Sequence, residues 1–182
     1  LDINILALIF INTPPTRARF LILVLLIATL TNSVSSSSVF DGKEVKFISK
    51  TSNKHSLGLI YMFTTVYLGM KPNEHEFKVM GLAPYAKGEM ILRVKKIFDE
   101  MIWLNKNTLQ FETSSDISSI LSFLHQELKP YRFDYVAAAI QLKTEELLTE
   151  FVKVAISKTK IRNLALVGGV FMNIKANMLI SN

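Results

Sequence analysis

A pair of glycines near the end of the chain is the first feature that could support chemistry. Gly168 and Gly169 follow the apolar run 163–167 and precede Val170 and Asn173 in a segment of helical character. Two glycines at the carboxyl end of a strand let a ligand approach the backbone, and the next helix directs its free N–H groups at that ligand. Nucleotides bind at such turns, although a Gly-Gly turn also serves simply to reverse the chain.

The segment of residues 71–88 is the second candidate, because it combines Gly, Pro and charged residues between two predicted helices. Loops of this kind often line binding sites, and a solvated connector has a similar composition. Its candidate site residues are Glu74, Glu76, Lys78, Gly81 and Tyr85.

The three histidines are the third candidate group. None of His55, His75 and His125 has a histidine or cysteine neighbour at the spacing of metal ligands, so the sequence predicts no metal site made by this chain alone. His55 and His75 flank a predicted helix and its loop and could share a pocket. Structural or surface roles are the competing interpretation for all three.

The elements that must position these residues change in character along the chain. The apolar run 20–30 predicts a buried strand, the run 3–11 a second one, and residues 39–48 a hairpin with Asp41-Gly42 at its turn. Helical periodicity then dominates. The predicted helices cover residues 56–69, 89–103, 116–128 and 134–158, followed by a strand at 163–167 and a further helix from Val170. We therefore expect an α/β fold in which a mixed sheet has flanking helices.

Composition narrows the classes of protein further. The chain has 182 residues, of which 49% are hydrophobic and 20% charged, so it can bury a core and is not of disordered composition. Its net charge of +6 favours anionic partners, and the absence of cysteine excludes thiolate catalysis and disulfides. The apolar run 20–30 is too short to span a bilayer. Residues 1–35 nevertheless have the order of a secretory leader, which leaves an exported protein as an alternative.

Several blocks of sequence carry a family resemblance. They include His55-Ser-Leu-Gly-Leu-Ile-Tyr61, Glu76-Phe-Lys-Val-Met-Gly-Leu-Ala-Pro-Tyr85 and Leu166-Val-Gly-Gly-Val-Phe-Met-Asn-Ile-Lys-Ala-Asn177. In this order they resemble the carbamoyltransferase family that includes nodulation and antibiotic O-carbamoyltransferases. The resemblance covers residues 39–182.

The resemblance implies an actin-like, RNase H-like ATPase fold. It also implies a reaction in which ATP and carbamoyl phosphate form a carbamoyl adenylate, whose carbamoyl group passes to a hydroxyl of a small-molecule acceptor. A divalent metal ion, iron by this resemblance, would act at the site, and the setting would be cytoplasmic, with no nucleic-acid or membrane partner. The residues that match the family's nucleotide site are Glu76, Lys78, Gly81, Gly168, Gly169, Val170 and Asn173, and His55, Glu74 and Tyr85 are further pocket candidates.

The chain also departs from the family pattern. The family carries a His-x-x-x-His pair and a glycine- and aspartate-rich turn near the first strand, whereas residues 26–33 read Leu-Ile-Ala-Thr-Leu-Thr-Asn-Ser, with no acidic residue. We therefore expect residues 1–38 to be a divergent segment with buried strands and residues 39–182 to be a partial nucleotide-binding domain without the smaller C-terminal domain. Such a fragment or degenerate copy would bind ATP weakly and turn nothing over. An inactive nucleotide-binding or interaction module is the alternative.

Overall fold

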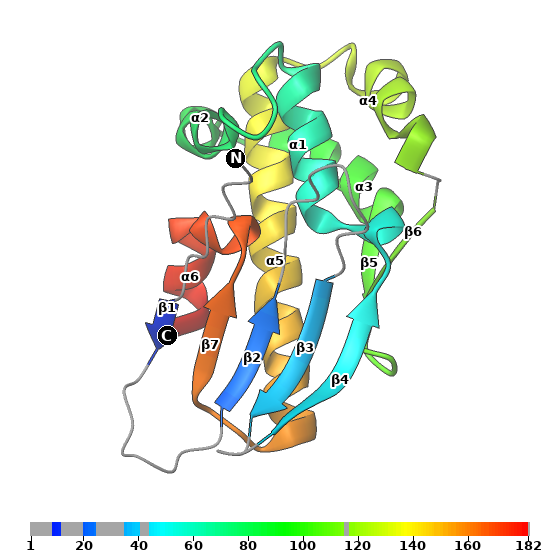
Figure 1. Cartoon of the computed structure of the whole chain (residues 1–182). Coiled ribbons are helices and arrows are strands. Elements are labelled where there is room, and N and C mark those ends of the chain that lie inside the picture. Colours follow the sequence, from blue (N-terminus) through cyan, green and yellow to red (C-terminus); the bar gives the residue numbers. More distant parts are fainter. Residues whose placement is uncertain (1–8, 12–19, 25–34, 41–43, 115–116, 182) are drawn as a thin grey trace.

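The computed structural model describes residues 9–11, 20–24, 35–40, 44–114 and 117–181 (Figure 1). A five-stranded sheet forms one side of it, in the strand order β1-β7-β2-β3-β4. The strands are β1 (Ile9–Ile11), β2 (Phe20–Val24), β3 (Ser35–Phe40), β4 (Val45–Thr51) and β7 (Leu164–Val167). β2 and β7 run parallel, whereas the other neighbours are antiparallel, so the predicted mixed sheet is confirmed.

The predicted strands near the amino end are present as far as the described residues reach. The strand predicted over residues 20–30 is present as β2 over residues 20–24. Residues 25–30 lie outside the described residues, and so does the predicted burial of the strand. The predicted hairpin is formed by β3 and β4, in which Val39 pairs with Lys46. Its expected turn at 41–42 lies outside the described residues. The domain boundary expected between residues 38 and 39 falls within β3 and stays a prediction.

Four helices that the hydrophobic periodicity predicted are present. They are α1 (Leu57–Tyr67), α3 (Met90–Met101), α4 (Ile120–Leu128) and α5 (Phe133–Thr159). Ser56 caps α1, because its hydroxyl accepts a hydrogen bond from the backbone N–H of Leu59. Short 3₁₀ turns precede α1 and α4, namely η1 (Asn53–His55) and η3 (Ile117–Ser119).

Helix α5 is the central support of the fold. It passes behind β7, β2 and β3 and continues beyond the sheet, where α1 and α3 accompany it (Figure 1). Its buried stripe shares one hydrophobic core with Leu164 and Leu166 of β7 and with Phe98 of α3. α5 ends where Lys160 adopts a left-handed conformation with φ of 58°. The apolar stripe of this helix therefore faces the core.

The segment 71–88 differs from the predicted loop. It contains the helix α2 (Glu76–Leu82) and the 3₁₀ turn η2 (Ala83–Tyr85). Burial of Val79 gives α2 an inward face, and Pro84 stands at the start of η2, where its missing N–H costs nothing. Gly81 and Pro84 are therefore part of helical turns in this segment and do not prevent helix formation.

Two further predictions need correction. The helix predicted over 89–103 ends at Met101, and a hairpin that the sequence did not predict follows, formed by β5 (Ile102–Asn105) and β6 (Gln110–Thr113). The helix predicted from Val170 begins later, because η4 (Gly169–Met172) precedes α6 (Ile174–Ser181).

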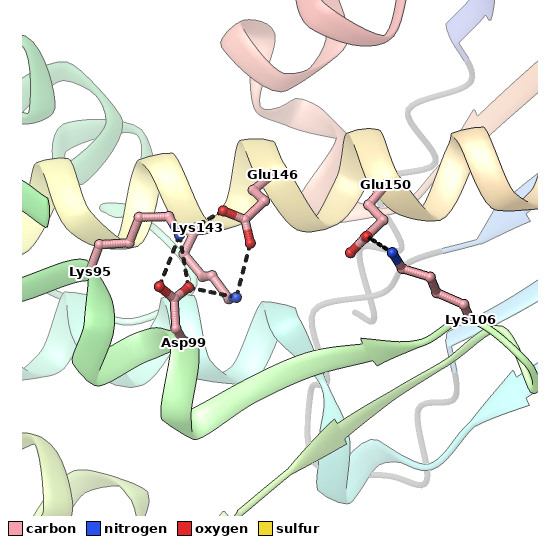
Figure 2. A network of polar contacts seen from close by, with 6 residues as sticks. All are labelled: Lys95, Asp99, Lys106, Lys143, Glu146 and Glu150. Carbon is pink, nitrogen blue, oxygen red and sulfur yellow. Dashed lines mark hydrogen bonds and ion pairs between the residues drawn. The ribbon is translucent and has the colours of Figure 1, made fainter.

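A network of four charged side chains joins α3 to α5 (Figure 2). Lys143 is only 4% exposed and lies 2.7 Å from Asp99 and 3.2 Å from Glu146. Lys95 contacts the same two carboxylates at 2.8 and 2.6 Å. Each carboxylate thus accepts from both ammonium groups, which ties the two helices together.

Among the helices that the structure describes, none has both the length and the apolar character that spanning a bilayer requires.

Candidate functional site

A cavity of about 300 Å³ lies where the two predicted binding segments approach each other. Its walls come from α1, from the turn and helix over residues 73–80, from α5, and from η4 with the residue that follows it. The lining residues are Leu57, Gly58, Tyr61, Asn73, Glu74, Glu76, Phe77, Met80, Thr144, Gly169, Val170, Met172 and Asn173. Gly169 of the Gly168–Gly169 turn and part of the segment 71–88 therefore line one concave site.

Five of the predicted site residues lie around this cavity: Glu74, Glu76, Gly169, Val170 and Asn173. Gly168, directly after β7, has φ of 112°, a conformation that side-chain-bearing residues rarely adopt. The glycine therefore lets the chain turn from the strand into η4. Contact of these residues with a ligand stays a prediction.

The other candidates lie away from the cavity lining. His55 binds Thr113 of β6, with 2.7 Å between Nδ1 and Oγ1, and Tyr85 on η2 is 76% exposed. Lys78 is exposed, its Nζ lies 3.0 Å from His75 Nε2, and the exposed Gly81 has open space where a Cβ would stand. His55, Lys78, Gly81 and Tyr85 therefore do not line the cavity with Glu76.

Gln141 of α5 organises the wall that η4 forms. Its amide exchanges two hydrogen bonds with the amide of Asn173, at 2.9 and 3.0 Å. Gln141 also accepts from the Tyr61 hydroxyl at 3.0 Å and donates to Glu145 at 2.7 Å. Asn173 Oδ1 in turn accepts from the backbone N–H of Ala176 and so caps α6. The side chain that the sequence assigned to a ligand is thus committed mainly to holding the site together.

Thr144 contributes a hydroxyl that lacks a partner in the part of the chain that the structure describes. The residue is 1% exposed and lines the cavity, one helical turn beyond Gln141. A buried polar group without a hydrogen bond is unfavourable by about 1–3 kcal/mol.

Two carboxylates give one end of the cavity its negative charge. Glu76 Oε1 accepts from the backbone N–H of Asn73 at 2.7 Å, which fixes the carboxylate at the start of α2. A hydrogen bond and the charge of Lys71 lower the pKa of Glu74. Burial, together with the nearby charges of Glu76 and Glu145, raises the pKa of Tyr61 well above its ordinary value, so this phenol stays protonated.

The metal that the resemblance implies has no evident place among these residues. Within the described ranges, no group of three or more histidine or acidic side chains is arranged to hold a metal ion. The parallel pairing of Val24 with Val167 places the carboxyl ends of β2 and β7 at the same edge of the sheet, beside the Gly168–Gly169 turn. The residues after β2 lie outside the described part of the chain, so we assign no ligand there.

Comparison with known proteins agrees with this arrangement of motifs. The carbamoyltransferase N-terminus family matches residues 8–182. The chain belongs to this family.

Similarity to this carbamoyltransferase domain extends to two uncharacterized proteins. One, from Methanocaldococcus jannaschii, is 33% identical over 128 residues, which are 68% of this chain and 20% of that protein. The other, from Synechocystis sp., is 31% identical over 137 residues, which are 68% of this chain and 22% of that protein. The chain thus spans about a fifth of the length of these curated relatives.

Among the residues of the site that sequence reasoning missed are Tyr61, Gln141 and Thr144. The last two interrupt the apolar stripe of α5 with buried polar side chains. Because a buried polar side chain needs a partner, such an interruption is the signal that could have identified them.

Proposed function

We propose that this carbamoyltransferase domain binds the nucleoside portion of ATP in the cavity between α2 and η4. In the reaction that this serves, ATP, carbamoyl phosphate and water give a carbamoyl adenylate, pyrophosphate and phosphate, and the carbamoyl group then passes from the adenylate to a hydroxyl of a small-molecule acceptor, with release of AMP. We further infer an actin-like ATPase arrangement and a cytoplasmic setting. The proposal rests above all on one observation: the two family motifs meet around a single cavity.

The walls of the cavity suit a nucleoside. Leu57, Met80 and Val170 provide apolar surface for a flat base. The volume of the cavity is at the lower end of the range for small-molecule sites. Gly169 permits close approach of the ligand to the backbone. The phosphates would extend from the cavity along the edge at which β2 and β7 end, since ligands of α/β sheets bind at the carboxyl ends of parallel strands.

The residues of this chain would bind and orient the nucleotide, and the described ones offer little for the chemical step. Within the described ranges, no lysine or arginine lines the cavity. Joining two polyanions requires positive charge at the reacting phosphates. The lack of a lysine or arginine in the described cavity lining favours a second candidate function, a domain that binds nucleotide without turning it over.

Calorimetric titration with ATP tests the proposal. Thr144→Val removes a buried, unpartnered hydroxyl from a residue that lines the cavity, and Thr149→Val removes an equally unpartnered hydroxyl from a residue of α5 outside the lining. We expect roughly fivefold weaker ATP binding for Thr144→Val, the loss of about one hydrogen bond, and unchanged binding for Thr149→Val. Equal affinities of the two variants would contradict this location of the site.

Release of pyrophosphate by the purified chain, with ATP and carbamoyl phosphate present, separates the two candidates. Release above background supports a complete enzyme site, whereas binding without release supports the binding domain.

A further inference from the structure

The turn that leads into α2 is closed by a histidine side chain. We propose that His75 is a pH-sensitive clamp: its neutral imidazole holds the turn 71–75 in the cavity wall, and protonation of the ring releases this turn. The response of the turn to pH goes beyond the proposed function, and only its effect on ATP binding rests on that function.

Two hydrogen bonds join His75 to Lys71 and close the turn. The backbone N–H of His75 donates to the Lys71 carbonyl at 3.0 Å, and the backbone N–H of Lys71 donates to Nδ1 of the imidazole at 3.1 Å. The second bond needs an unprotonated Nδ1, because both nitrogens of a charged imidazole are donors. Closure of the turn therefore depends on the protonation state of one side chain.

The turn that His75 closes is part of the cavity wall. Asn73 and Glu74 line the cavity from the turn itself, and Glu76 and Phe77 line it from the first turn of α2. Asn73 has φ of 62°, a left-handed conformation that persists only where surrounding contacts fix it. Release of the clamp therefore loosens the wall at a backbone position that needs support.

Protonation of the ring would change the sense of two contacts. Nδ1 would present a proton to the N–H of Lys71, and Nε2, which lies 3.0 Å from the Lys78 ammonium nitrogen, would bring a second cation against it. Glu74 is the nearby group whose charge attracts a positive ring, but Lys71 forms an ion pair with this carboxylate. The charged ring thus loses its acceptor role and gains a repulsive neighbour.

The other elements around α2 leave this balance unchanged. α1, α5 and η2 pack against α2. Tyr61 of α1 and Glu145 of α5 are titratable groups near the start of α2, and both bind Gln141, whereas Tyr85 of η2 is 76% exposed. Among the described residues, none of these three groups forms a hydrogen bond or ion pair with His75. Histidine changes its charge between about pH 5 and 8, so the clamp should respond in this range.

Hydrogen–deuterium exchange of the whole chain at about pH 7.5 and about pH 5.5 tests the inference. Mass spectrometry reads peptides that cover residues 71–80, with rates corrected for the intrinsic effect of pH on exchange and with peptides of α5 as the internal reference. His75→Asn is the decisive variant, because its side-chain oxygen can accept from the Lys71 N–H and does not titrate. His75→Ala removes the clamp at both pH values. His125→Asn, at an exposed histidine of α4, is the matched control.

In the unmodified chain and in His125→Asn, we expect exchange in residues 71–80 to be roughly fivefold faster at the lower pH, the loss of about one hydrogen bond. His75→Asn should exchange slowly at both pH values and His75→Ala rapidly at both, while α5 should not respond. Exchange in residues 71–80 of the unmodified chain that is independent of pH would overturn the inference. A pH response that His75→Asn retains would overturn it as well.

Calorimetry with ATP at the same two pH values connects the clamp to the proposed function. ATP should bind the unmodified chain about fivefold more weakly at the lower pH, beyond any change that His75→Asn also shows. Equal pH dependence of the two proteins would overturn the effect of the clamp on ATP binding. If ATP binds at neither pH, the proposed function fails, whereas pH-dependent exchange that His75→Asn abolishes would still support the clamp.

Discussion

Gln141 joins three segments that are distant in the sequence. Its amide binds Tyr61 of α1, Glu145 of α5 and Asn173 ahead of α6. All four hydrogen-bonding positions of the amide are therefore used. Such fully satisfied buried networks rigidify a site, and they are costly to break because every partner is left without its bond.

Replacing Gln141 with leucine should destabilise the protein by about 2–3 kcal/mol, since the buried Tyr61 hydroxyl and the Asn173 amide lose their partner. Urea denaturation measures this loss. Gln126→Leu on the exposed face of α4 is the control and should change stability by less than about 0.5 kcal/mol. ATP binding should weaken only in the Gln141 variant. Similar stability of the two variants would mean that the network contributes little.

The sequence predicts the segments that form the site more accurately than it predicts the side chains that line it. The sequence predicts a loop over residues 71–88, in which every polar residue could face a ligand. In a helix, residues four apart share a face whereas residues two apart diverge. Glu76 and Met80 of α2 accordingly line the cavity, whereas Lys78 does not. A motif thus locates a segment, but the conformation of that segment decides which side chains reach the cavity.

At the scale of elements, the ion network between α3 and α5 links stability to pH. Partial burial opposes ionisation of Asp99 and Glu146, but hydrogen bonds and charges from Lys143 and Lys95 outweigh it and lower both pKa values. A lowered pKa in the folded state contributes stability above the unfolded pKa, and this contribution is lost as pH falls through the folded pKa. The network should therefore weaken below about pH 4.

Lys143→Met should reduce this acid sensitivity, because Asp99 and Glu146 then lose one of their two cations. At pH 7 we expect a loss on the order of 1 kcal/mol, since the carboxylates are half-exposed and screened. Chemical denaturation at several pH values between 3 and 7 measures both effects. Lys153→Met, an exposed lysine of the same helix, is the control and should keep the pH profile of the unmodified chain. An unchanged profile in Lys143→Met would show that the network does not respond to acid.

The elements that the sequence predicted are those with long hydrophobic periodicity or a clear cap. α5 and the Ser56 cap of α1 are examples. The β5–β6 hairpin escaped prediction because each strand has four residues and its stability comes from tertiary contacts. Phe111 of β6 stacks on Phe151 of α5 with ring centroids 5.3 Å apart. Local sequence carries no signal of such a contact.

At the scale of the whole molecule, one hydrophobic core joins the helices to β7 and to the small hairpin. Phe98 of α3, Leu124 of α4 and Leu166 of β7 are all fully buried in it. Because these elements share their buried surface, damage at one point should be felt throughout the fold.

Phe98→Ala should cost about 3–5 kcal/mol, the usual effect of removing a buried aromatic ring. Amide hydrogen exchange should accelerate in α5 and β7 as well as in α3. Leu92→Ala is the control on the same helix, because Leu92 is 59% exposed, and its effect should stay within about 0.5 kcal/mol. Faster exchange confined to α3 would contradict a single cooperative core.

The parallel pairing of β2 with β7 has a consequence for how the protein is made. Ile22 pairs with Ala165, so β2 leaves the ribosome before its partner and must wait until β7 has been made. Helices and the β3–β4 hairpin depend on closer neighbours and can form first. Contacts between residues so far apart slow folding, because a long loop must close before they form. During synthesis, the edge of β2 that β7 will occupy therefore stays open, and chaperones would protect the nascent chain best in this interval.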